Sequence, residues 1–146
     1  ALRRMRGLAA PGGVVAVRDA DYAAMTWYPN PPELEEWRAL YRHLATASGG
    51  QPDAGRRLLA WARAAGFSRI TPSASTWCFA TDESRAQWGG MWADRIVDSD
   101  LARQALASGA AQEQDLQRIR AAWHRWAADG DGWFTITHGE LLCRND

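Results

Sequence analysis

The chain has 146 residues, enough for one domain with a hydrophobic core of moderate size. It is 47% hydrophobic and 23% charged, and no stretch approaches the roughly 20 apolar residues of a membrane span, so we expect a cytoplasmic protein without a membrane partner. Its 17 basic residues, all arginine, balance 17 acidic ones. This zero net charge argues against the broad basic surface of a nucleic-acid-binding protein.

The first element is an arginine-rich helical stretch that ends at the turn Ala10-Pro11-Gly12-Gly13. The β-branched run Val14-Val15-Ala16-Val17 follows at once. A helix stopped by proline and two glycines before such a run is typical of a doubly wound α/β sheet, with the strand covered on both faces. The next segment, Asp21 to Pro32, is expected to be a loop.

Two helices and a strand come next. Apolar residues at helical spacing predict a helix from Pro32 to the glycines at 49 and 50, and a second helix that ends at Gly66. Residues 67–80 alternate as in a strand. Because Pro72 cannot donate a ladder hydrogen bond, we expect this strand at the edge of the sheet.

The remaining pattern is helical from Thr81 to about residue 128, and residues 133–144 form a final strand. The sequence therefore predicts a single partial α/β domain over residues 1–146, with a three-stranded sheet and its flanking helices in 1–80 and 133–144. Residues 81–132 form a helical insertion, or lid, between the last two strands.

Three segments in order resemble the second half of class I S-adenosylmethionine-dependent methyltransferases. Leu8 to Asp21 resembles the turn and fifth strand of that family, residues 58–67 resemble the helix that ends in Ala-Gly-Phe before the sixth strand, and Trp133 to Arg144 resembles the seventh strand. Residues 55–58, Gly-Arg-Arg-Leu, are also similar to a Gly-Arg-x-Leu stretch of the ubiquinone/menaquinone-biosynthesis-like branch.

The resemblance implies the C-terminal half of a doubly wound Rossmann-like sheet, whose last strand is antiparallel and lies between the other two. It also implies the C-terminal, substrate-side part of a methyltransferase that acts on a small molecule. S-adenosylmethionine would bind the full-length parent. The glycine-rich cofactor turn is absent from this chain, so we expect no cofactor-binding residues, no cofactor bound by the chain alone and no activity alone. No metal site is expected.

Candidate site residues follow the first strand, because ligands of open α/β sheets bind outside the carboxyl ends of the strands. Asp19 and Asp21 are candidates for a general base or for a group that orients the nucleophile. The alternative is that both cap the next turn and pair with arginines. Arg18 and Tyr22, beside them, are candidate substrate-binding residues.

Further aromatic and basic residues complete the candidate substrate site. Trp27 and Tyr28 could form an aromatic wall with Tyr22, or could be ordinary core residues. Arg56 and Arg57 stand where the helix dipole disfavours a cation, which suggests an anionic ligand; the alternative is solvated surface arginines.

The tryptophans support two interpretations. Nine such residues exceed what a small core requires, which suggests that some line a pocket. Trp88 and Trp92 share one helix face and could belong to a lid over the substrate, or to a plain helical core.

Two alternative functions remain open. The chain could be a stand-alone module that binds a small molecule in a Trp-rich pocket. It could instead be a fragment without a ligand that forms a homodimer through the exposed edge of its first strand.

Overall fold

A computed structural model describes residues 1–145 and divides into two units. The first unit contains Ala1–Met25, Pro52–Trp77 and the chain from Ile136 onwards. The second contains Thr26–Gln51 and Cys78–Thr135.

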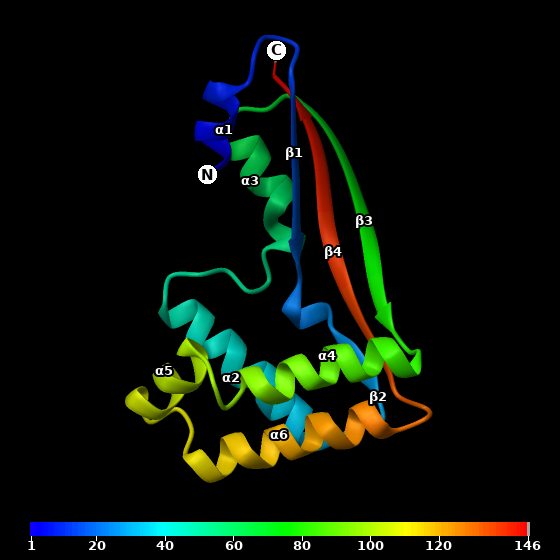
Figure 1. Cartoon of the computed structure of the whole chain (residues 1–146). Helices are drawn as coiled ribbons and strands as arrows, with labels where there is room; N and C mark the ends of the chain where they lie inside the picture. The colour runs from blue at the N-terminus through cyan, green and yellow to red at the C-terminus, as the bar shows by residue number, and fades with distance from the viewer. Residues whose placement is uncertain (146) are drawn as a thin grey trace. The chain divides into compact units, whose positions relative to one another are not determined.

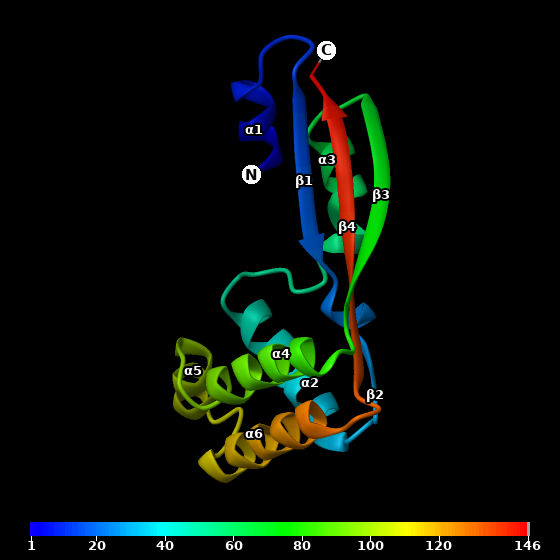
Figure 2. The same ribbon diagram turned by 45° about the vertical axis from the view of Figure 1, so that its right-hand side comes forward.

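The first unit is built on a sheet with helices packed against one face. Its elements are α1 (Leu2–Leu8), β1 (Val14–Ala20), α3 (Leu58–Ala64), and most of β3 (Arg69–Phe79) and β4 (Trp133–Arg144). β4 lies between β1 and β3 and runs antiparallel to β1, as predicted for the last strand (Figures 1 and 2). The structure is thus α/β with an open sheet.

The turn before β1 is hydrogen-bonded to the residue that follows β4. Gly12 has a φ of 75°, the left-handed region that favours glycine. Its N–H donates to the carbonyl of Asn145 at 2.6 Å, and the N–H of Asn145 donates to the carbonyl of Gly13 at 2.9 Å. The predicted Pro-Gly-Gly turn therefore also closes the far end of β4.

One face of this sheet forms the core of the first unit. Side chains alternate along β1 and β4, so Val15 and Leu141 point to the same face, where they meet α3. The buried members of this core are Val15, Leu58, Ala62, Ala65, Phe67, Leu141 and Cys143.

The opposite face is open within this unit. Val14 and Leu142 expose 52% and 53% of their surface, and Trp77 on β3 exposes 47%. The prediction that the first strand is covered on both faces is therefore wrong for the residues that the structure describes. The apolar run predicted burial, but it could not show which segments supply the cover.

Both outer strands of the first unit pair only with β4 within residues 1–145. For β3 this confirms the edge position predicted from Pro72, whose missing N–H would interrupt a central strand. For β1 it leaves one row of backbone groups without a strand partner.

The second unit is mainly helical. It contains β2 (Thr26–Tyr28), α2 (Pro32–Ala47), α4 (Asp82–Arg95), α5 (Asp100–Ser108) and α6 (Glu113–Ala128). α4 and α6 run antiparallel beside each other (Figures 1 and 2). The three helices between β3 and β4 were predicted as the insertion. No helix within residues 1–145 is long and apolar enough to cross a membrane.

Local side chains explain where these helices begin. Pro32 occupies the first turn of α2, where its missing N–H costs nothing. Thr81 accepts a hydrogen bond from the N–H of Ser84, and the Ser84 hydroxyl accepts one from the N–H of Thr81. This reciprocal pair is a capping box at the start of α4.

The expected loop from Asp21 to Pro32 is not wholly irregular. It contains a 3-10 helix, η1 (Tyr22–Ala24), and the short strand β2, so the sheet has four strands rather than three. β2 pairs Thr26 with Thr135 and Tyr28 with Trp133. Three residues are too few to show a period of two, and a partner strand about 100 residues away decides the conformation.

Candidate functional site

Most of the predicted site residues lie in the first unit, at or near the carboxyl end of β1. Arg18 pairs with Glu140 across the sheet, and Ala20 pairs with His138. The N–H of Asp21 donates to the carbonyl of Thr137 at 3.0 Å, which continues the ladder by one residue. By alternation, Arg18 and His138 point to the open face, and Asp19 and Asp21 point to the helix-covered face.

Asp21 is buried and paired with Arg56. Nε of Arg56 donates to one carboxylate oxygen at 2.5 Å, and its NH2 group donates to the other at 2.9 Å. The Asp21 side chain is 6% exposed and that of Arg56 is 54% exposed. The hydrogen bond and charge of Asp21 raise the pKa of Arg56. This geometry matches the alternative in which Asp21 pairs with an arginine.

Arg56 reaches Asp21 from η2 (Gly55–Arg57), a 3-10 turn just before α3. That turn touches the sheet because Gly55 has no side chain. A Cβ there would lie 2.8 Å from the carbonyl oxygen of Asp19 and 2.9 Å from the backbone nitrogen of Gly139. Arg57, the other predicted arginine of the turn, is exposed.

The two other predicted residues of this region are less constrained. Asp19 is exposed, and its Oδ1 accepts a hydrogen bond from the N–H of Ala20 at 2.8 Å. Tyr22 is half-buried, and its N–H donates to the carbonyl of Pro52 at 3.1 Å. The structure therefore brings Asp19, Asp21, Tyr22 and Arg56 together at one end of β1.

A polar network on the open face was not foreseen. Nε of Arg18 lies 3.0 Å from Oε1 of Glu140, and NH2 of Arg18 donates to the Ser75 hydroxyl at 3.0 Å. The hydroxyls of Ser75 and Ser73 donate to the two Glu140 oxygens at 2.6 and 3.2 Å. These donors, that of Ser75 first, lower the pKa of Glu140, so the carboxylate stays ionised.

His138 stands beside this network. Its ring centroid lies 4.5 Å from that of Trp77, and the Arg18 guanidinium lies 4.8 Å from the centre of the Trp77 ring. His138 is 6% exposed, and its Nδ1 has no hydrogen-bond partner within the described chain. Burial, and next the charge of Arg18, lower the pKa of His138 and favour the neutral imidazole.

A shallow hollow of about 340 Å³ adjoins these side chains. Ala16, Leu142, Arg18, Ser73 and Glu140 are among the residues that line it. The open face thus combines an apolar surface with fixed charges and hydroxyls, the mixture that orients small polar molecules.

The other predicted aromatic residues belong to the second unit. Trp27 is buried and stacks on Phe134 with 5.4 Å between ring centroids. Tyr28, next to it on β2, is 57% exposed. The aromatic wall proposed for Tyr22, Trp27 and Tyr28 therefore draws on two units, and Trp27 has the burial of a core residue.

The tryptophan-rich helices form a core. Trp37, Trp92 and Trp123 are at most 1% exposed, and Trp37 makes edge-to-face contacts with the other two at centroid distances of 4.6 and 4.9 Å. Trp88 is half-buried and stacks on Phe79 at 4.3 Å. The burial of Trp92 favours the core interpretation over a pocket lining, because a ring without exposed surface cannot contact a ligand.

Sequence reasoning missed His138, Glu140 and Trp77. His138 and Glu140 are two residues apart in a predicted strand, so a shared face was readable. The register between β1 and β4, two strands about 120 residues apart in the chain, decides which face of the sheet these residues share. The same register places Arg18 opposite Glu140. Only the pairing of β4 with both β1 and β3 shows that these residues form one group.

Neither a cofactor cradle nor a metal site is found in the part of the chain that the structure describes. Within residues 1–145, no three His, Cys, Asp or Glu side chains could hold a metal ion together. Gly12 and Gly13 precede a strand, and the strand-to-helix connection before α4 contains no glycine. S-adenosylmethionine requires a close backbone approach after a strand, so these residues do not fit it.

Comparison with known proteins adds one relative. The chain is 32% identical over 153 aligned residues to an uncharacterized methyltransferase of Schizosaccharomyces pombe. The alignment takes in 100% of the chain and 52% of the yeast protein, so the chain spans about half the length of that relative. No protein-family model matches the chain. The similarity supports the methyltransferase part of the resemblance seen in the sequence.

Proposed function

We propose that this chain is the C-terminal, substrate-side part of an S-adenosylmethionine-dependent methyltransferase that acts on a small molecule. The observation that carries the proposal is the antiparallel β4 between β1 and β3, the order expected from the resemblance. Its similarity to a yeast methyltransferase about twice as long is in keeping with a partial chain.

In this proposal the cofactor is bound by residues outside the chain, because the described residues do not fit it. S-adenosylmethionine would supply the methyl group. The chain contributes the substrate contacts at the carboxyl end of β1.

The residues at the end of β1 have different roles in this proposal. Asp21 is held by Arg56 and orients the turn that carries Tyr22, so we assign it a positioning role. Asp19 is exposed and is the carboxylate with room to accept a substrate proton. Arg18 on the open face offers a donor to a polar substrate, and the buried neutral His138 lies beside Trp77, the ring over which the Arg18 guanidinium packs.

The test begins with the gene. Sequencing upstream of the Ala1 codon should reveal an open frame that encodes a strand, a glycine-rich turn and a helix in that order. The longer protein should transfer radiolabelled methyl groups to members of a panel of phenols, quinols and carboxylic acids. The 146-residue chain alone should bind no S-adenosylmethionine in calorimetry.

Variants then separate substrate and cofactor roles. In the longer protein, Asp19→Asn and Arg18→Gln should lower methyl transfer without changing cofactor affinity, whereas His124→Gln, at an exposed histidine of α6, should leave both unchanged. Saturable cofactor binding by the 146-residue chain would overturn the proposal that it carries only the substrate side.

The free edge of β1 favours a second candidate, self-association of the chain. Within the described residues β1 pairs only with β4, and Val14 beside that edge is 52% exposed. Unpaired strand edges template pairing with another copy. Light scattering should then give twice the 16.2 kDa of a single chain, and a monomer at high concentration would exclude this candidate.

A further inference from the structure

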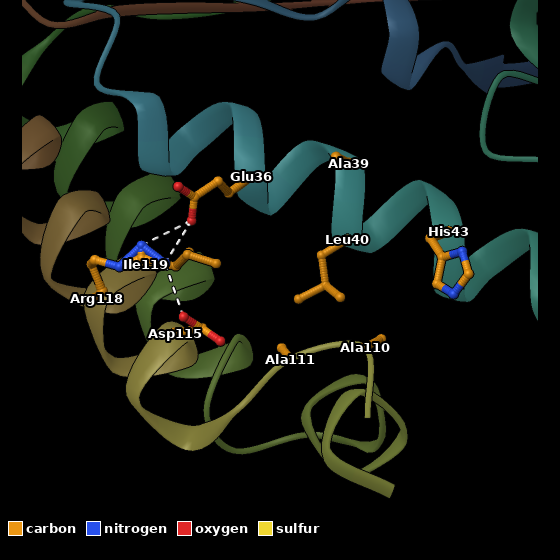
Figure 3. A pocket seen from close by; sticks show the side chains of 9 residues that line it. All are labelled: Glu36, Ala39, Leu40, His43, Ala110, Ala111, Asp115, Arg118 and Ile119. Carbon is orange, nitrogen blue, oxygen red and sulfur yellow. Dashed lines mark hydrogen bonds and ion pairs between the residues drawn. The ribbon is translucent and has the colours of Figure 1, made fainter. Parts of the chain in front are cut away.

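The second unit contains a hollow of about 540 Å³ between α2, α6 and the connection from α5 to α6 (Figure 3). This volume is within the range of small-molecule sites. Ala39 and Leu40 on α2, Ala110 and Ala111 on the connection, and Ile119 on α6 supply apolar surface. None of these residues belongs to the site at the end of β1.

The charged residues of the hollow are gathered at one end (Figure 3). Arg118 donates to Oε2 of Glu36 from NH1 at 3.0 Å and from NH2 at 2.8 Å. The same NH2 group donates to Oδ1 of Asp115 at 3.0 Å. One guanidinium thus faces two carboxylates, and the three side chains together carry one net negative charge.

The C-terminal helix end beside the hollow also favours a positively charged ligand. α5 ends at Ser108, and its left-handed C-cap Gly109 leads directly to Ala110 and Ala111 in the wall. A helix C-terminus carries partial negative charge. The positive N-terminal end of α6 already has Glu113 and Asp115 in its first turn.

The spacing along α2 sets the length of the ligand. Glu36, Leu40 and His43 lie on one face, four and three residues apart. At a rise of 1.5 Å per residue, Glu36 and His43 are separated by about 10 Å along the helix. The apolar surface lies between the acidic end and the imidazole.

We propose that this hollow binds a small amphiphilic cation, an amine with an apolar body of about 10 Å. The ammonium group lies against Oε1 of Glu36, and the apolar body covers Leu40 and Ile119 toward His43. Arg118 contacts Oε2 of Glu36 and Oδ1 of Asp115, and Oδ2 of Asp115 accepts from the N–H of Gln112, which leaves Oε1 of Glu36 for the ammonium group. The site is independent of the proposed methyltransferase function.

The probe is 4-phenylbutylamine, compared with the neutral 4-phenylbutanol and the anionic 4-phenylbutyrate. Titration of the ¹⁵N-labelled 146-residue chain should give saturable amide shifts centred on Ala39, Leu40, Ala110 and Ala111. The amine should bind about fivefold more tightly than the alcohol, the scale of one partly exposed ion pair. The carboxylate should bind still more weakly.

Two variants test the charge and the cavity. Glu36→Gln should reduce the amine to the affinity of the alcohol, whereas Glu35→Gln on the same helix, whose carboxylate pairs with Arg38, should not. Ala111→Trp should block all three probes while the remaining amide spectrum stays folded. Equal affinities for amine and alcohol, or shifts centred elsewhere, would overturn the proposal.

Discussion

Arg56 holds the buried carboxylate of Asp21 with two hydrogen bonds, at 2.5 and 2.9 Å, and so joins the turn before α3 to the end of β1. The two partners are unequal, because the Asp21 side chain is 6% exposed and that of Arg56 is 54% exposed. Removing Arg56 therefore leaves a buried carboxylate, whereas removing Asp21 leaves a guanidinium that is half exposed to water.

Arg56→Ala should destabilise the chain more than Asp21→Ala. Without Arg56 a buried carboxylate loses its partner, whereas without Asp21 the guanidinium is still hydrated. We expect about 1 to 2 kcal/mol of lost unfolding free energy for Asp21→Ala. Urea unfolding of both single variants and of the double variant checks this, and the double variant should be nearer to Asp21→Ala. An Arg56→Ala variant as stable as the wild type would contradict it.

The acid sensitivity of the first unit should depend on His138. Burial, and next the charge of Arg18, lower its pKa; the backbone contact with Ile136 and the charges of Glu140 and Asp19 offset this in part. As the pH falls, the unfolded chain therefore takes up the proton first. The stabilisation from neutral His138 is complete above about pH 6.5 and is lost progressively below it.

Urea unfolding between pH 7.5 and 5.5 measures this loss. His138→Gln should flatten the decline, and His124→Gln at an exposed position should not. Arg18→Ala should raise the pKa of His138 toward its ordinary value in an NMR titration. A His138 that titrates above about pH 6.5 in the wild type would be incompatible with the burial of its ring.

Much of the fold was predictable because its signals are local. The Pro-Gly-Gly turn before β1, Pro32 at the start of α2 and the Thr81 cap of α4 each depend on a few neighbouring residues. The short strand β2 escaped prediction because a strand about 100 residues away fixes it. The open face of β1 escaped too, since its apolar run indicates burial without naming the partner.

The site was only partly predictable for the same reason. Asp19, Asp21 and Tyr22 lie at or just after the end of a strand that the apolar run predicts. Arg56 lies in the turn just before a predicted helix. The position of His138, opposite Ala20 and on the other face of the sheet from Asp21, depends on the register of β4. The role of the tryptophans was not predictable from their number, since composition alone could not separate the packed core of the second unit from a ligand pocket.

The tryptophan core predicts a large difference between two substitutions. Trp123 is fully buried among other rings, so Trp123→Ala should cost about 3 to 5 kcal/mol of unfolding free energy. Trp77, 47% exposed on the open face, should cost less than about 1.5 kcal/mol when changed to alanine. Thermal and urea unfolding distinguish the two. A mild Trp123→Ala variant would show that this ring lines a site instead of filling a core.

The closest backbone approach in the first unit gives the sharpest prediction. A Cβ on Gly139 would collide with the carbonyl oxygen of Gly55, a backbone atom that no side-chain rotation can move. Gly139→Ala should push η2 away from the sheet and cost about 3 kcal/mol. Gly90→Ala is the matched control, because Gly90 lies inside α4 and a methyl group added there would meet nothing within 4 Å. That change should stabilise the chain by about 0.5 to 1 kcal/mol.

Because Arg56 moves with η2, Gly139→Ala should also release Asp21, which methyl and amide NMR signals around Asp21 would report. Equal stabilities for the two variants would mean that the η2 turn does not contact β4 in solution.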